Sequence, residues 1–404
     1  MKALRKYLDR IKPNFEPGGK LHAFHSVFDG FETFLFTPRD TSRSGVHIHD
    51  SIDSKRTMII VVLALIPCLL FGIYNTGYQH WLAIGASTFP FWKLMAYGFL
   101  AILPTLITAY AVGLGIEFIV AQWRGEEIQE GFLVSGMLIP LICPVNTPVW
   151  MIAVATAFAV IFAKEVFGGT GYNIFNVALV TRAFLFFAYP AHMSGDNAFV
   201  ATEPICGLGG AVADGFTGAT PLGQVASTTT GNISITAVNG SDISTLDAFI
   251  GLIPGSFGET STLCILIGAA ILLFSGIASW RIIFSVFAGG ALMAWIAHTF
   301  ATPTYPASML SPLDQLLLGG FAFAAVFMAT DPVTGARTNI GKYIYGFLIG
   351  VFAILIRTYN TGYPEGAMLA ILLMNAFAPL IDYFVVQANI RRRMRRLTNK
   401  NNKA

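Results

Sequence analysis

Apolar residues fall into ten long runs along this chain, separated by short polar or glycine-rich stretches. Most of these runs approach the roughly 20 residues that a helix needs to cross a bilayer, so the pattern predicts transmembrane helices. The third, fourth, fifth, eighth and ninth runs are shorter, which predicts helices that are broken or that cross only part of the membrane. The ten runs cover residues 57–74, 94–121, 131–143, 149–163, 174–189, 261–279, 282–300, 316–329, 343–356 and 367–386.

The composition agrees with a membrane protein. Hydrophobic residues make up 54% of the 404 residues and charged residues only 12%, about half the charged share of a soluble domain. A water-soluble fold of this size could not cover so much apolar surface. The four cysteines have no C-x-x-C spacing, so no iron–sulfur or metal centre is predicted from this chain alone. The predicted fold is therefore an all-α integral membrane protein of about ten helices.

The basic residues are concentrated at the two ends of the chain. Ten of the 25 lysines and arginines lie in residues 1–56, and seven follow Ala388. Positive charge stays on the cytoplasmic side during insertion, so both termini of this multi-pass protein are predicted to lie on the cytoplasmic side of the membrane. The arginine-rich tail is expected to contact the lipid bilayer and not nucleic acid. The basic connectors that would also lie inside are Arg124, Lys164, Arg281, Arg337 and Lys342.

Two basic residues and one long stretch without lysine or arginine complete the predicted topology. Lys93 and Arg357 fall at predicted outer helix ends, where long side chains can reach the lipid headgroups. Residues 183–280 contain no lysine or arginine, which indicates a location away from the cytoplasm. Within this stretch, residues of about 190–260 are rich in Gly, Thr and Ser and form the one large outer loop.

This topology divides the chain into five parts. They are a cytoplasmic N-terminal arm (1–56), a first five-helix membrane repeat (57–190), an outer loop (191–260), a second five-helix membrane repeat (261–386) and a basic cytoplasmic tail (387–404). Similar turn motifs recur in the two halves, at Pro144–Thr147 and Thr170–Asn173 and again at Asp331–Gly335 and Thr361–Pro364. Each motif would lie on the opposite membrane face from its counterpart, so the halves are predicted to be inverted repeats, with functional sites where they meet.

The outer loop contains the segment Asp214–Thr220 (DGFTGAT), whose threonines are candidates for carrying a covalent group. Gly215 and Gly218 keep the backbone open, because glycine adopts conformations that are closed to other residues. Pro221 biases Thr220 toward extended backbone, outside a helix. An ordinary surface turn uses the same residue types, so spacing alone leaves both interpretations open.

Acidic residues within or beside the apolar runs are costly in a membrane, which makes them candidates for an ion path. Asp331 follows the eighth run, Glu130 precedes the third, and Asp382 lies near the end of the tenth. Carboxylate oxygens are suitable ligands for Na⁺, and unwound carbonyl groups of the repeats could complete the coordination. An Asp-Pro turn at Asp331 and a solvated helix start at Glu130 are the structural alternatives.

Five motifs spread over the chain resemble those of the B-subunit family of Na⁺-translocating NADH:quinone oxidoreductases and, more distantly, the D subunits of Rnf complexes. The polar N-terminal arm favours the quinone oxidoreductase family. The motifs cover residues 15–20 (FEPGGK), 163–171 (AKEVFGGTG), 181–190 (TRAFLFFAYP), 327–332 (FMATDP) and 363–366 (YPEG). They reach from the arm to the last helix, so the resemblance extends over nearly the full chain.

The resemblance implies a flavoprotein subunit that passes electrons to ubiquinone, coupled to the transport of Na⁺. It implies FMN esterified through its phosphate to Thr220, attached by a separate flavin transferase, and a non-covalent riboflavin without an assigned place. Asp214, Thr217, Gly218 and Ala219 surround the attachment site, and Thr217 stands where the family usually has serine. Electrons would arrive from the sibling subunits A, C, D, E and F of the complex.

Four further positions are candidates, three from the same resemblance and Arg182 from its place inside an apolar run. Gly168 and Gly169 lie in the region that it assigns to ubiquinone, although two glycines equally suit a helix cap. No strand precedes them, so no NADH site is predicted. Arg182, inside the fifth run, is predicted either to pair with an acid in the bundle or to contact a flavin phosphate or quinone carbonyl. Asp29, in the arm, aligns with an acidic family position and joins the candidates for the Na⁺ path.

Two other functions fit parts of the sequence. A secondary transporter without redox activity would also have inverted repeats, broken helices and intramembrane acids. A D subunit of an Rnf complex would carry flavin but would move electrons between NADH and ferredoxin. A covalent flavin would argue against the transporter, and quinone reductase activity would argue against the Rnf subunit.

Overall fold

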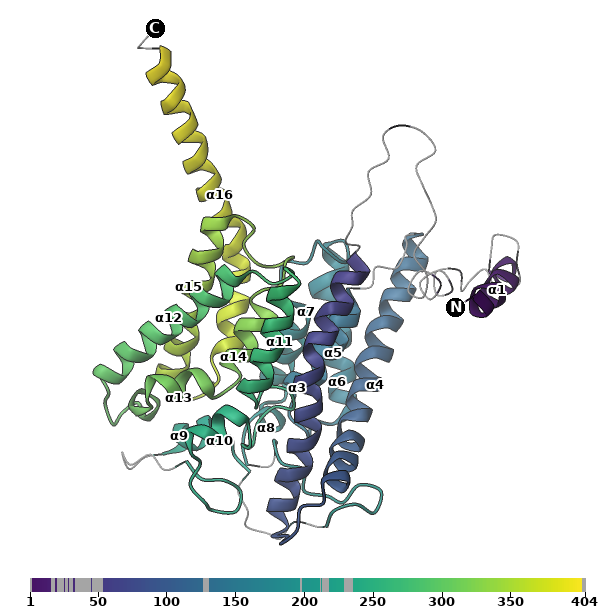
Figure 1. The fold of residues 1–404 in the computed structure, drawn as a ribbon, viewed down its shortest axis with the longest axis vertical. Coiled ribbons are helices and arrows are strands. Elements are labelled where there is room, and N and C mark those ends of the chain that lie inside the picture. The colour runs from purple at the N-terminus through teal and green to yellow at the C-terminus, as the bar shows by residue number, and fades with distance from the viewer. Residues whose placement is uncertain are drawn as a thin grey trace.

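The chain folds as a bundle of helices (Figure 1). The computed structural model describes residues 2–15, 54–125, 131–196, 198–210, 218–228 and 235–401, together with residues 19, 25, 28, 32, 45 and 212. Within these residues no strand forms, and the only bridges are the isolated pairs Ile205–Leu208 and Thr236–Asp242. The predicted all-α fold is therefore confirmed.

The first half of the bundle is built around two long helices. α3 (Ser54–Ala83) packs along α4 (Phe91–Arg124), and the short helix α5 (Phe132–Ile142) packs against both. The remaining elements are α6 (Val149–Ala159), a π-helical turn η3 (Val160–Lys164), a 3₁₀ turn η4 (Glu165–Phe167) and α7 (Val177–Ala188). α6 continues directly into its two turns and packs against α4 and α7.

The second half packs around α15 (Asn339–Tyr359), which contacts α12 (Trp280–Thr299) and α16 (Ala367–Asn401). α11 (Thr262–Phe274) lies against α3 and so joins the two halves. The short elements between α12 and α15 are η5 (Pro306–Met309), α13 (Pro312–Leu317), α14 (Phe321–Phe323) and a second π-helical turn, η6 (Ala324–Met328).

Three short helices cover one end of the bundle, opposite the end where α3 begins and from which α16 projects (Figure 1). They are α8 (Pro190–Met193), α9 (Pro221–Ser227) and α10 (Thr245–Ile250). The N-terminal arm contributes α1 (Lys2–Ile11) and a 3₁₀ turn, η1 (Lys12–Asn14).

Every predicted apolar run contains a helix, but three of the predicted lengths are wrong. Among the described residues, six helical segments are long and apolar enough to cross a membrane, and they include Val149–Phe167 and Asn339–Tyr359, which were predicted to be short. The sixth run, predicted to be full length, yields only the 13 residues of α11. α15 gains a turn because the Thr338 hydroxyl caps its start and the Asp382 carboxylate accepts the Thr338 N–H at 3.0 Å. The inverted-repeat relation stays a prediction.

Close packing of α3 on α4 depends on glycine. A Cβ atom added at Gly98 would lie 1.8 Å from the carbonyl oxygen of Ile73, whereas one added at Gly115, on the same helix, would meet nothing within 4 Å. We expect Gly98→Ala to cost about 1–3 kcal/mol of stability, because the two backbones must separate. Gly115→Ala should be neutral or stabilise by about 1 kcal/mol. Thermal unfolding in detergent measures both, and equal melting temperatures would contradict the close contact.

Candidate functional site

A pocket of about 410 Å³ lies at the end of the bundle that carries α8, α9 and α10. It is lined by the second half of α7, by α8 and the residues after it, by α9 and its cap, and by the loop before α16. The lining residues include Arg182, Phe186, Asp196, Phe199, Ala219, Thr220, Gly223, Ser227, Tyr363 and Glu365. We call this cavity the outer pocket.

Thr220 lies at the wall of the outer pocket, directly before α9. Its backbone is extended, with φ −61° and ψ 154°, and its hydroxyl oxygen accepts a hydrogen bond from the Gly223 N–H at 3.1 Å. The predicted extended geometry at Thr220 is therefore confirmed, and Pro221 begins the helix. The side chain is half-buried, so its oxygen lies at the pocket surface and outside the helical turn that it caps.

Gly218 allows the chain before α9 to lie close to the residues that follow α8. Its N–H donates to the carbonyl oxygen of Asp196 at 3.1 Å, and a Cβ atom at this position would lie 2.7 Å from the same oxygen. Gly218 and Ala219 are both buried and lead the chain into the pocket wall. Asp214 and Thr217, the other candidates of this loop, lie outside the described residues.

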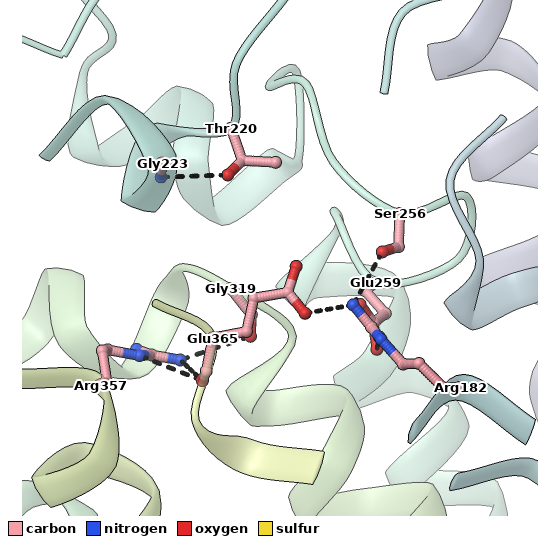
Figure 2. A network of polar contacts seen from close by, with 8 residues as sticks. All are labelled: Arg182, Thr220, Gly223, Ser256, Glu259, Gly319, Arg357 and Glu365. Atoms are coloured by element: carbon pink, nitrogen blue, oxygen red, sulfur yellow. Dashed lines mark hydrogen bonds and ion pairs between the residues drawn. The ribbon is translucent and has the colours of Figure 1, made fainter. Parts of the chain in front are cut away.

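Arg182 reaches the outer pocket from α7 and is held by two carboxylates (Figure 2). Only 4% of its surface is exposed. One guanidinium nitrogen donates to Glu259 Oε1 at 2.8 Å, and the other contacts the carboxylate of Glu365 and the Ser256 hydroxyl, the latter at 3.3 Å. Pairing with acids inside the bundle, one of the two predictions for Arg182, is what the geometry shows.

Arg357 forms the second half of this network (Figure 2). The prediction that its side chain reaches the lipid headgroups was wrong. Instead of reaching toward headgroups it is 2% exposed. Its guanidinium donates to the carbonyl oxygens of Gln315, of Gly319 at 3.3 Å and of Glu365 at 3.1 Å. Burial of this cation is possible because these carbonyls supply the hydrogen bonds that water would otherwise provide. Arg182, Arg357, Glu259 and Glu365 together carry no net charge.

Asp331 lies at the opposite end of the bundle, in a second cavity of about 100 Å³ that we call the inner cavity. Its carboxylate accepts hydrogen bonds from the Val333 N–H at 3.0 Å, the Thr334 hydroxyl at 3.1 Å and the Asn176 amide at 3.2 Å. Asn173 and Lys164 line the same cavity. This arrangement contains the Asp-Pro turn that was the structural alternative, and it also places Asp331 in the lining of a mostly apolar cavity.

Asp382, the other described candidate for an ion path, does not line the cavity that contains Asp331. Asp382 lines a separate, neighbouring cavity of about 390 Å³, and its carboxylate accepts the backbone N–H groups of Arg337 at 2.7 Å and Thr338 at 3.0 Å. It therefore stabilises the start of α15. Glu130 and Asp29 lie outside the described residues. Within the part of the chain that the structure describes, no three acidic, histidine or cysteine side chains cluster as they would around a metal ion.

Gly168 and Gly169 end the helical stretch that begins with α6. Their φ angles are +117° and +90°, which favour glycine, and their N–H groups donate at 3.1 Å to the carbonyls of Glu165 and Lys164. The geometry is that of a helix cap, the alternative interpretation of this pair. The two glycines line neither the outer pocket nor the inner cavity, and their quinone role stays a prediction.

A buried ion pair beside the inner cavity was missed in the sequence. Lys164, predicted to be an exposed connector, is 4% exposed and pairs with the carboxylate of Glu117, which is 5% exposed. This pairing lets a lysine lie inside the bundle and lets α6 continue to Phe167. The signal was present, because Glu117 is an acid in the middle of the second apolar run.

The comparisons with known proteins complete the description of this site. The model of the NQR2, RnfD, RnfE family matches residues 41–391, more than four fifths of the chain. The chain belongs to this family. The matched range contains Arg182, Thr220 and Glu365 of the outer pocket and Asp331 of the inner cavity.

Several curated proteins are similar to the chain over almost its whole length. The B subunit of the Na(+)-translocating NADH-quinone reductase of Chromohalobacter salexigens is 44% identical, covering 97% of this chain and 96% of the relative. The protein of the same name from Klebsiella pneumoniae strain 342 is 43% identical, and that from Pseudomonas aeruginosa strain LESB58 is 42% identical. Both alignments cover 97% of this chain and 99% of the relative.

Proposed function

We propose that this chain is the B subunit of a Na⁺-translocating NADH:ubiquinone reductase and carries FMN, esterified through its phosphate, on Thr220. One observation carries the proposal: Thr220 and Arg182 line the same pocket. Flavin supplies reversible electron transfer when bound, and the protein controls its orientation and potential. The relatives named for this reductase support the same assignment.

The residues of the outer pocket fit a flavin. Its volume of about 410 Å³ lies in the range of small-molecule sites. Phe186, Phe199 and Tyr363 offer aromatic faces to a flat ring. Arg182 also lines the pocket, and Glu259 and Glu365 hold its guanidinium in one orientation while they offset its charge.

The second, non-covalent flavin, riboflavin, belongs to the proposal without an assigned place, because the inner cavity of about 100 Å³ is smaller than the sites that hold small molecules. The proposal further includes ubiquinone reduction near Gly168 and Gly169, electron supply by subunits A, C, D, E and F, and maturation by a flavin transferase. Both termini would be cytoplasmic and the outer pocket would face the periplasm of a bacterial inner membrane.

Coupling to Na⁺ gives a separate prediction. Asp331→Asn keeps the size of the side chain but removes its charge, so we expect the Na⁺ concentration for half-maximal quinone reduction to rise several-fold. Asp314→Asn is the control, because Asp314 lies in the first turn of α13 at the other end of the bundle, where its carboxylate accepts the hydroxyl of Ser311, the cap of the helix. Steady-state assays of the complex over a Na⁺ series measure both variants. An unchanged Na⁺ dependence in Asp331→Asn would remove Asp331 from the ion path.

Two experiments separate this proposal from its rivals. Flavin fluorescence that survives denaturation would exclude a transporter without redox activity. Ubiquinone reductase activity in the purified complex would exclude a D subunit of an Rnf complex. Of the two, the flavin measurement tests this chain directly, because the attachment residue is its own.

A further inference from the structure

A fourth cavity, of about 390 Å³, lies at the turn between α11 and α12, at the end of the bundle opposite the outer pocket. Its polar and aromatic lining comes from Ser279 of the turn, from Trp280 and Arg281 of the first turn of α12, and from Lys342 of the first turn of α15. Ile277 and Ala278 line both this cavity and the inner cavity, so the two adjoin, but Ser279, Arg281 and Lys342 belong to neither the outer pocket nor the inner cavity. We call this fourth cavity the basic cavity.

Two cations and no acid line the basic cavity. Within the described part of the chain, neither Arg281 nor Lys342 forms an ion pair, and the Arg281 guanidinium stacks 5.3 Å from the Trp280 ring. Both side chains are partly buried. A charge that is partly removed from water without a counter-ion is costly, so the cavity favours an anion.

The backbone around these cations is held in one geometry. The Ser285 hydroxyl donates to the carbonyl oxygen of Arg281 at 2.6 Å and contacts that of Lys342 at 3.4 Å, which joins the first turns of α12 and α15. Gly346 allows this contact, because a Cβ atom there would lie 2.2 Å from the Ser285 hydroxyl oxygen. Arg281 and Lys342 therefore line one cavity from two helices that pack closely against each other.

Ser279 adds an unused polar group. It occupies the position before α12, yet its hydroxyl does not cap the helix, and this buried oxygen has no hydrogen-bond partner within the described residues. The first N–H groups of a long helix also lack partners in the helix itself. Hydroxyl, N–H groups and two cations are the donor set that binds phosphate oxygens.

The surroundings of the basic cavity show what kind of phosphate it would bind. Phe274, at the end of α11, is 94% exposed, and Phe284, one turn into α12, is 61% exposed. Trp280 and Tyr343 are also exposed and pack edge to face, with 6.0 Å between ring centroids. Apolar side chains bordered by Trp and Tyr are typical of the boundary between acyl chains and headgroups. The cavity therefore opens where lipid headgroups lie.

We propose that the basic cavity binds the phosphate of an anionic phospholipid, with the acyl chains along Phe274 and Phe284. Arg281, Lys342 and Ser279 would contact the phosphate, and Trp280 would lie at the level of the glycerol. Soluble phosphate shares this chemistry and is the other source of the anion. The proposal needs only that the chain spans a membrane, so it stands or fails independently of the flavin on Thr220.

The test measures lipid binding to the intact complex after delipidation in a neutral detergent. Dioctanoyl-phosphatidylglycerol, dioctanoyl-phosphatidylcholine and inorganic phosphate are each titrated, and bound molecules are counted by native mass spectrometry. We expect Arg281→Gln with Lys342→Gln to weaken phosphatidylglycerol binding about 10-fold to 30-fold, given what each basic residue contributes near an anionic surface. Ser279→Ala, which leaves both charges, should weaken it less.

The matched control removes two charges elsewhere at the same end of the bundle. Arg124→Gln with Arg337→Gln alters two exposed connector residues that do not line the cavity. Equal losses in both double variants, or no loss in Arg281→Gln with Lys342→Gln, would overturn the proposal. Binding of inorganic phosphate that depends on Arg281 and Lys342 and that displaces phosphatidylglycerol would support the phosphate site and assign it to a soluble anion.

Discussion

Thr220→Val is expected to carry no flavin after denaturation, whereas the unaltered chain, co-produced with its flavin transferase, gives a fluorescent band in a denaturing gel. Valine matches the shape of threonine but has no hydroxyl to form the phosphoester. The substitution also removes the cap that Thr220 gives to α9 through the Gly223 N–H, which costs about 1 kcal/mol and does not unfold the bundle. Loss of fluorescence therefore reports loss of attachment.

Ser227→Ala is the matched control for this measurement. Ser227 lines the same pocket from the end of the same short helix, and its hydroxyl donates to the carbonyl oxygen of Gln224 at 2.9 Å. We expect this variant to fluoresce like the unaltered chain. A fluorescent Thr220→Val band would place the flavin on another residue. A dark band from the unaltered chain, with confirmed transferase activity, would favour the transporter.

Arg182→Ala is expected to destabilise the chain by about 3–5 kcal/mol, because it leaves buried carboxylates without their partner. Glu259 is 9% exposed and Glu365 contacts the same guanidinium, so removing Arg182 leaves two negative charges close together. Scanning fluorimetry of the purified complex in detergent measures the fall in melting temperature.

Two further variants test the reason for that loss. Arg124→Gln is the control, since the side chain of Arg124 is 31% exposed where it pairs with Glu165 at 3.4 Å, and such pairs contribute about 1 kcal/mol or less. Arg182→Met combined with Glu259→Gln should be more stable than Arg182→Ala, because the charges that remain in the network, on Glu365 and Arg357, balance each other. If this double variant is no more stable, the loss comes from packing and not from charge.

The helices and the conformation of Thr220 could be predicted because both depend on nearby residues. Runs of apolar residues locate each helix, and Pro221 alone is enough to bias Thr220 toward extended backbone. The network around Arg182 could not be predicted in the same way. Arg182 lies 77 residues from Glu259 and 183 from Glu365, and no local pattern pairs residues at such distances.

The predictions of helix length and of which charges are buried failed for a related reason. The fourth predicted run ends before Lys164 because a lysine is expected outside the membrane, whereas its partner Glu117, 47 residues earlier, lets it lie inside the bundle. The same expectation placed Arg357 at a membrane surface, whereas carbonyls 38 and 42 residues away enclose it. Lys164 and Arg357 are therefore buried because the fold supplies partners that lie far away in the sequence.

The length of α16 has a mechanical consequence. The helix starts immediately after the Tyr363–Gly366 turn at the outer pocket, runs through the bundle and projects beyond its far end (Figure 1). Its 35 residues span about 52 Å, against about 30 Å of hydrocarbon. A rotation of α16 about its end at the pocket would therefore displace its arginine end further than any of its residues inside the bundle. A tilt of about 5° at the pocket would carry the arginine end sideways by about 4–5 Å.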